Sequence, residues 1–173
     1  VYRFRTYVVS GEFDYFLTKP LSPLFRSLLG GSDILDLAMI FISVAFIVFS
    51  AARLDGITFL SSISYLLLII NAFIIAMSLH ILVISVGVLT TEIDNTIMLY
   101  RDITQMGRIP VDIYREPLSF LITFVIPVGI MMTFPAKALM GLLSWQFIFI
   151  SILISTVFLI ISLQLWRISL KNY

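Results

Sequence analysis

Hydrophobic residues along this chain are grouped into four long stretches that carry almost no charge. Short segments that contain most of the Lys, Arg, Asp and Glu residues separate them. A helix needs about 20 apolar residues to cross the hydrocarbon core of a bilayer, and each stretch is close to or above that length. The pattern predicts an all-α membrane protein with four transmembrane helices, at about residues 34–52, 57–91, 117–134 and 142–166.

The second stretch is long enough for one tilted helix or for two short spans. It contains no proline and no clear turn signal. With a single crossing, only Arg53 and Lys137 lie on the side away from the chain ends. Lys and Arg concentrate on the cytoplasmic side of membrane proteins, so we predict one long helix and both ends of the chain in the cytoplasm. The positive residues predicted to be cytoplasmic are Arg3, Arg5, Lys19, Arg26, Arg101, Arg108, Arg115, Arg167 and Lys171.

The third and fourth stretches contain further local signals. Pro127, followed by Val and Gly, predicts a kink in the third helix. The segment 135–141 is too apolar for an ordinary external loop, so we predict a short outer re-entrant element there. Trp145 and Trp166 lie near opposite ends of the fourth helix. Their separation of roughly 33 Å along a helix matches the aromatic belts at two membrane interfaces.

Composition supports a membrane protein and excludes several functions. The chain is 60% apolar and 12% charged, whereas soluble domains are about 45–50% apolar and about 25% charged. Its net charge of +1 provides no field for binding nucleic acid. It contains no cysteine, a single histidine, no Gly-rich phosphate loop and no Gly-x-Ser-x-Gly motif. We therefore predict no catalytic residue, no metal site and no enzyme activity in this chain.

Two polar residues lie deep in the second stretch. Asn71 and His80 are nine positions apart, which places them on different faces of a helix. An ionisable or strongly polar residue within the membrane is a candidate for a translocation path. The alternative is that each side chain forms a hydrogen bond to a neighbouring helix, worth roughly 0.6 kcal/mol.

The pattern of the segment before the first span predicts two short amphipathic helices. Glu12 and Asp14 begin the first, and Lys19 and Pro20 end it. Ser22 caps the second. The pair fits two interpretations: it lies on the inner leaflet, or it is a docking element on which a cytoplasmic partner acts.

Two motifs resemble permease subunits of bacterial ATP-binding-cassette exporters, of the type-2 permease superfamily. The first is GEFDYFLTKPLSPLF at residues 11–25, and the second is GRIPVDIY at 107–114 with LITFVIPV at 121–128 and FPA at 134–136. The resemblance extends loosely over the whole chain. It implies six spans in the complete subunit, two of them before Val1. Lys19 stands where the family more often has Arg.

The resemblance also implies a function and a set of site residues. Residues 1–33 would be a cytoplasmic coupling segment, and residues 34–173 the transmembrane domain of a prokaryotic inner-membrane exporter. A separate ATPase subunit would bind ATP and Mg, and a second permease subunit, identical or not, would complete the path for efflux of a small organic or amphiphilic compound by alternating access. The candidate coupling residues are Glu12, Phe13, Asp14, Lys19, Pro20 and Arg26.

Two alternatives remain at this stage. A secondary transporter would show inverted repeats, broken helices near the midplane and coupling-ion carboxylates, of which only the Pro127 kink is present. An intramembrane enzyme would need a partner for His80, and none is evident.

Overall fold

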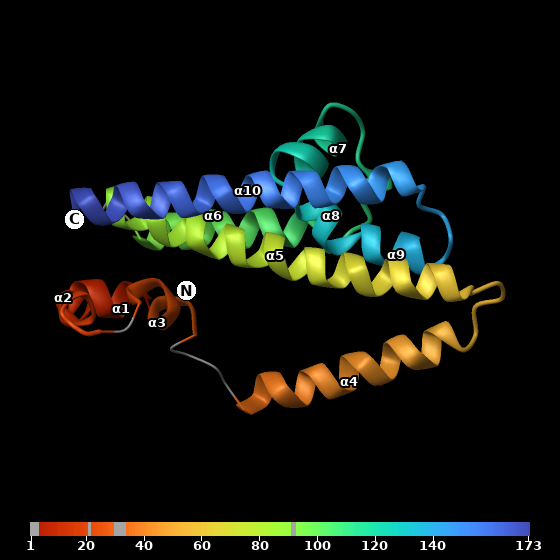
Figure 1. The fold of residues 1–173 in the computed structure, drawn as a ribbon, viewed down its shortest axis with the longest axis horizontal. Coiled ribbons are helices and arrows are strands. Elements are labelled where there is room, and N and C mark those ends of the chain that lie inside the picture. The colour runs from red at the N-terminus through yellow and green to blue at the C-terminus, as the bar shows by residue number, and fades with distance from the viewer. Residues whose placement is uncertain (1–3, 21, 30–33, 91–92) are drawn as a thin grey trace.

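The computed structural model describes residues 4–20, 22–29, 34–90 and 93–173, and every regular element within these residues is helical (Figure 1). Arg3, counted above among the cytoplasmic charges, lies outside the described residues. The elements in chain order are α1 (Phe4–Val9), α2 (Glu12–Leu17), α3 (Pro23–Leu29), α4 (Ile34–Ala51), α5 (Phe59–Thr90), α6 (Ile93–Met106), η1 (Val111–Ile113), α7 (Leu118–Phe120), η2 (Leu121–Val125), α8 (Val128–Met132), α9 (Phe134–Leu139) and α10 (Trp145–Asn172).

Two long helices, α5 and α10, form the core of the molecule. They pack side by side and run in the same direction (Figure 1). Their 32 and 28 residues correspond to about 48 and 42 Å of helix, more than the hydrocarbon core of about 30 Å. Both are long and apolar enough to cross a membrane. The prediction of one long helix in the second stretch is confirmed, because α5 is continuous from Phe59 to Thr90.

A seven-residue repeat of small and polar side chains lines the contact between α5 and α10. The repeat keeps these positions on one side of each helix. Small side chains let helix backbones approach closely within membranes, where burial of apolar surface provides no driving force. Most of the hydroxyls donate to a carbonyl of their own helix, as Ser78 does to Ile74 at 2.7 Å. The buried members are Ser64, Asn71, Ser78 and Ser85 on α5, and Ser155, Ser162 and Ser169 on α10.

The chain returns from the end of α5 to the start of α10 along a path different from the predicted one. We predicted a single span at 117–134, preceded by a cytoplasmic segment. Instead, α6 runs back along α5, and α8 and α9 continue to the start of α10 (Figure 1). The predicted span is divided among α7, η2 and α8. The reason is that α6 has an apolar stripe, including Ile97, Tyr100 and Ile103, which packs on the two core clusters despite nearby charges.

Helix α4 stands apart from the other long helices (Figure 1). It is apolar apart from Asp36 in its first turn, and its side chains from Leu35 to Ser50 are exposed. Its 18 residues span about 27 Å, slightly less than the hydrocarbon core. The described residues therefore contain two clear apolar spans and one shorter apolar helix, and four continuous spans are not confirmed.

Candidate coupling and translocation site

Three short helices before α4 form a compact group, which we call the coupling unit (α1, α2 and α3). The two helices expected in this region are confirmed as α2 and α3, and α1 is an additional helix. Gly11 joins α1 to α2 with a φ of 75°, a left-handed conformation that glycine adopts without strain. The Ser22 hydroxyl accepts the backbone N–H of Phe25 at 3.0 Å and caps α3, where Pro23 occupies the first position.

An aromatic cluster attaches the coupling unit to the end of the core helices. Phe13 is completely buried. Its ring makes edge contacts with Phe4 at 5.2 Å, with Trp166 at 6.4 Å and with Tyr173 at 5.1 Å between centroids. The same apolar cluster includes Ile84 of α5. Edge-to-face aromatic pairs contribute about 0.5–1.5 kcal/mol beyond the area they bury, so Phe13 is a fixed contact between α2 and α10.

A hydrogen bond reinforces this attachment. The Tyr173 hydroxyl donates to Asp14 Oδ1 at 2.7 Å. This bond to the carboxylate, with smaller effects of burial and of the Asp14 charge, raises the pKa of Tyr173 above its ordinary value of 10.0. Both residues are exposed to solvent, so the bond orients the two elements and adds little stability.

The remaining candidate coupling residues face outward. Glu12, Pro20 and Arg26 are exposed and Lys19 is partly exposed. Lys19 lies over the Tyr15 ring at 4.1 Å from its centroid, and Arg26 lies over the Phe16 ring at 4.3 Å. Such cation–π contacts hold a charged side chain in place while its head remains accessible. The structure therefore divides the six candidates into four that face outward and two that contact the end of α10, Phe13 through Trp166 and Asp14 through Tyr173.

Asn71 connects the two core helices. It is buried, its amide nitrogen donates to the Ser151 carbonyl at 3.3 Å, and its amide oxygen accepts the Ser155 hydroxyl. Both bonds cross from α5 to α10. Hydrogen bonds of this kind between two packed helices are explained by helix association alone.

His80 lies on a different face of α5, as the nine-residue spacing predicts. Its ring contacts the Tyr100 ring of α6 at 4.9 Å between centroids, with Nε2 3.1 Å from the Tyr100 hydroxyl. Nδ1 lies 2.7 Å from the Ala76 carbonyl. His80 and Asn71 therefore serve separate contacts, one to α6 and one to α10, and do not form one site.

The return path is interrupted between α6 and α8. Helices α7 and η2 form a turn that projects from the bundle (Figure 1). Ile126, with φ −115° and ψ 86°, leaves the helical conformation, and Pro127 precedes the start of α8. The chain is thus broken at the position where we expected a kink. Pro127 removes a backbone donor at this point.

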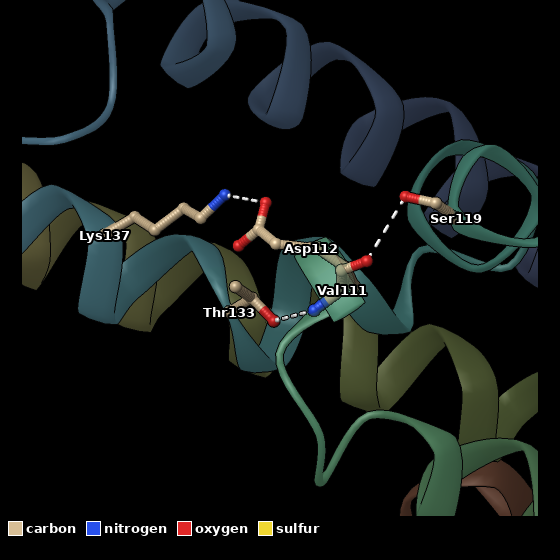
Figure 2. A network of polar contacts seen from close by, with 5 residues as sticks. All are labelled: Val111, Asp112, Ser119, Thr133 and Lys137. Carbon is tan, nitrogen blue, oxygen red and sulfur yellow. Dashed lines mark hydrogen bonds and ion pairs between the residues drawn. The ribbon is translucent and has the colours of Figure 1, made fainter. Parts of the chain in front are cut away.

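A charged segment (residues 107–116) fills the space beside this interruption, and Figure 2 shows how it is held. The Val111 N–H donates to Thr133 Oγ1 at 3.3 Å, and the Val111 carbonyl accepts the Ser119 hydroxyl at 3.3 Å. Lys137 Nζ of α9 forms an ion pair with Asp112 Oδ1 at 2.5 Å. The segment is therefore fixed to α8 and α9 by backbone and side-chain contacts.

Gly129 allows η1 to approach α8 closely. A Cβ at this position would lie 2.5 Å from Val111 Cγ1 and 2.9 Å from Thr123 Oγ1. Because these distances are shorter than real Cβ contacts, only glycine lets η1 rest on α8 without displacement.

The Asp112–Lys137 ion pair corrects the predicted sidedness. We placed the charged segment in the cytoplasm and Lys137 outside. An ion pair cannot form across a hydrocarbon core of about 30 Å, so this separation is wrong. The error follows from the predicted third span, which put a complete membrane crossing between the two.

Contacts of the elements that hold the charged segment indicate which end of α10 it lies nearer. Phe134, next to Thr133, contacts the ring of Phe147 at 6.3 Å. Toward the other end, Ile126 and Phe158 line one apolar cavity of about 280 Å³. The coupling unit instead contacts Trp166. Phe147 and Trp166 are 19 residues apart, or about 28 Å along a helix, so the two regions lie toward opposite ends of α10.

The family comparison extends over all of these elements. The sequence profile of the ABC-2 family transporter proteins matches residues 1–173. The chain belongs to this family. No curated protein and no solved structure matches it. As an ABC-2 family permease, the chain is a membrane component of a transporter and is not itself catalytic, and the family implies association with an ABC ATPase.

Family membership confirms the resemblance that the two sequence motifs indicated. It favours an ABC-type permease over a secondary transporter or an intramembrane enzyme. Sequence reasoning missed two contacts of the ABC-2 permease, the Asp14–Tyr173 hydrogen bond and the Asp112–Lys137 ion pair. An isolated Lys137 in an apolar stretch was the available signal for the second, because a charge at membrane depth needs a partner.

Proposed function

We propose that this chain is the permease subunit of an ATP-driven exporter in a prokaryotic inner membrane, and that a separate ATPase drives it through the coupling unit. The observation that carries the proposal is the position of the coupling unit, at one end of the core helices, with Phe13 buried against Trp166 and Tyr173. A force on α2 is thereby applied directly to α10.

The rigidity of the connection supports this mechanism. The α10 helix is continuous over 28 residues, about 42 Å, and it packs along α5 through the seven-residue repeat. A displacement at Trp166 is transmitted along one continuous helix to the region of Phe147. Packed helices move as units because close-packed interiors resist continuous deformation.

We assign separate roles to the candidate coupling residues. Glu12, Lys19, Pro20 and Arg26 form the surface that contacts the ATPase. Phe13 and Asp14 transmit the movement to α10, because Phe13 is inaccessible to a partner and Asp14 is bonded to Tyr173. ATP and Mg bind to the ATPase partner.

The proposed orientation places the coupling unit and the end of α10 in the cytoplasm. Lys19, Arg26, Arg167 and Lys171 all belong to this end of the molecule, in agreement with the concentration of positive residues on the cytoplasmic side. A second permease subunit, identical or related, completes the path, and α4 offers an exposed apolar surface to lipid or to that subunit. The proposed cargo is a small organic or amphiphilic compound.

ATP-dependent transport into inverted vesicles tests this function. Vesicles that contain the permease and its ATPase are expected to accumulate a compound from a test panel only with ATP and Mg. Glu12→Arg with Lys19→Glu is expected to abolish both ATPase retention and accumulation, because it reverses the charges of the outward surface.

Tyr173→Phe is the matched control, since it changes the inward contact and leaves the outward surface intact. It is expected to retain the ATPase. Accumulation that persists without ATP, or with the ATPase-binding surface reversed, contradicts the proposal.

A further inference from the structure

The apolar cavity of about 280 Å³ lies where α5, α6, η2 and α10 meet. Leu79 and Val83 of α5 line its inner side, and both are buried. Leu99 of α6 and Val125 of η2 also line it, and they are 60% and 57% exposed. The cavity therefore extends from the buried interior of the bundle to an opening between α6 and η2.

The lining of the cavity selects against charge. Among the described residues, those that line it include no Lys, Arg, His, Asp or Glu, and their polar side-chain groups are the hydroxyls of Thr96 and Tyr100. The Tyr100 hydroxyl lies 3.1 Å from His80 Nε2. A charged ligand would lose its hydration here without gaining a partner of opposite charge. An uncharged ligand fits this lining.

The size of the cavity sets the size of that ligand. Close-packed protein interiors contain few voids larger than a water molecule. A cavity of about 150 Å³ lined by apolar side chains stays dry and binds benzene. The present cavity is roughly twice as large, which gives room for two fused rings.

Two aromatic side chains favour a flat ligand. Phe158 of α10 and Tyr100 of α6 both line the cavity, and aromatic rings pair well in offset or edge-to-face contacts. A rigid ring system also loses less conformational freedom on binding than a flexible acyl chain does. A planar aromatic group therefore suits the cavity better than a lipid tail.

The irregular backbone of η2 forms part of the cavity wall. This element is a π-helix, and the Ile126 N–H donates to the Leu121 carbonyl, five residues back, at 2.9 Å. Val125 and Ile126, at the end of this turn, both line the cavity. π-Helical turns are rare and frequently occur at functional sites.

We propose that this cavity binds an uncharged, planar aromatic group of up to two fused rings, carried by the cargo of the exporter. This inference rests on the proposed function and deepens it, because it names a class of cargo. The group enters between Leu99 and Val125 and contacts the rings of Phe158 and Tyr100.

Photolabelling tests the binding. The probe is a trifluoromethyl phenyldiazirine, which is small, aromatic and uncharged, and it is applied without ATP to the assembled transporter in lipid nanodiscs. Mass spectrometry is expected to find label on Leu99 and Val125, and excess naphthalene to reduce it at least about fivefold, because a single site saturates. Leu153, 65% exposed on α10, is the control for probe dissolved in lipid, and its labelling should not change.

Two variants that fill the cavity sharpen this test. Val83→Phe and Val125→Phe each add a ring to the lining from a different element, and both are expected to abolish the labelling that naphthalene displaces. Val125 is exposed, so its variant keeps the test readable if Val83→Phe does not fold. Leu153→Phe adds the same ring outside the cavity and should retain the labelling. Labelling that naphthalene does not reduce, or that is unchanged in Val125→Phe, overturns the inference.

Transport measurements test whether the bound group belongs to the cargo. Val125→Phe is expected to raise the concentration of an aromatic test compound that gives half-maximal ATP-dependent accumulation at least about fivefold, as expected when binding is weakened. ATPase retention should be unchanged, and Leu153→Phe should behave as the original protein does. An unchanged concentration dependence in Val125→Phe, or a panel in which only non-aromatic compounds accumulate, contradicts the role in cargo binding.

The two measurements fail independently. Because the labelling is done without ATP, it remains readable if ATP-driven transport is not found. Loss of the saturable site would overturn the inference, whereas ATP-dependent accumulation of other compounds would still support the proposed function.

Discussion

Individual residues in this permease show that a polar side chain on a long apolar helix can find its partners on the neighbouring helices. Asn71 is satisfied by Ser151 and Ser155 of α10, and His80 contacts Tyr100 of α6. Phe13, by contrast, is apolar and carries the connection between the coupling unit and α10. Our assignment of roles in the proposed mechanism therefore rests on burial and partners rather than on polarity.

Phe13→Ala is expected to uncouple transport from ATP hydrolysis. Removing a fully buried aromatic ring costs about 3–5 kcal/mol in soluble cores, and here the loss falls on the contact between α2 and Trp166. ATPase retention should persist while ATP-dependent accumulation falls at least about tenfold. Phe13→Leu should restore part of the coupling, whereas loss of ATPase retention in both variants would argue against a transmitting role.

Asn71→Ala is expected to leave transport within about twofold of the original rate, since each interhelical bond contributes about 0.6 kcal/mol. Initial rates in vesicles measure this. A loss of transport with normal protein level and normal thermal stability would instead place Asn71 in the path.

The Tyr173–Asp14 bond predicts a dependence on alkaline pH. Because the folded state raises the pKa of Tyr173 above 10.0, the contribution of the bond is complete below pH 10 and is lost as the pH rises through the folded value. The ultraviolet absorbance titration of tyrosinate, compared with that of Tyr173→Phe, should reveal one group that ionises above the ordinary range. Asp14→Asn should return it to that range.

At the scale of elements, the seam between α5 and α10 depends on small side chains. Ser162→Leu is expected to lower the thermal stability of the purified protein, since overpacking a tight contact costs about 1–3 kcal/mol. Ser162→Ala, which keeps the volume and removes only a hydroxyl bonded to its own helix, should be close to neutral. Equal effects of the two substitutions would show that close approach at this position is unimportant.

The sequence predicted α5 and α10 well and the return path poorly, for a physical reason. Uncharged stretches identify helices that lipid can surround, so α5 and α10 were evident. Helix α6 combines an apolar stripe with Asp94, Arg101 and Asp102, and protein contacts rather than lipid stabilise it. The charges of the coupling unit were likewise visible in the sequence, but the burial of Phe13 depends on residues more than 150 positions away.

For the whole molecule, the coupling unit and the charged segment lie toward opposite ends of α10. In the proposed exporter, the end at the coupling unit receives the movement of an ATPase, and α10 carries that movement toward its other end. Alternating access requires such a connection between distant regions, and a continuous helix supplies it without intermediate joints.

Site-specific photo-crosslinking tests the central claim most directly. A photoreactive amino acid at Tyr15, 60% exposed on the coupling unit, is expected to crosslink to an ABC ATPase subunit in intact membranes. The same amino acid at Leu142, 69% exposed beside the start of α10, should not. An ATPase crosslink from Leu142, or none from Tyr15 in a transport-active complex, would contradict the account.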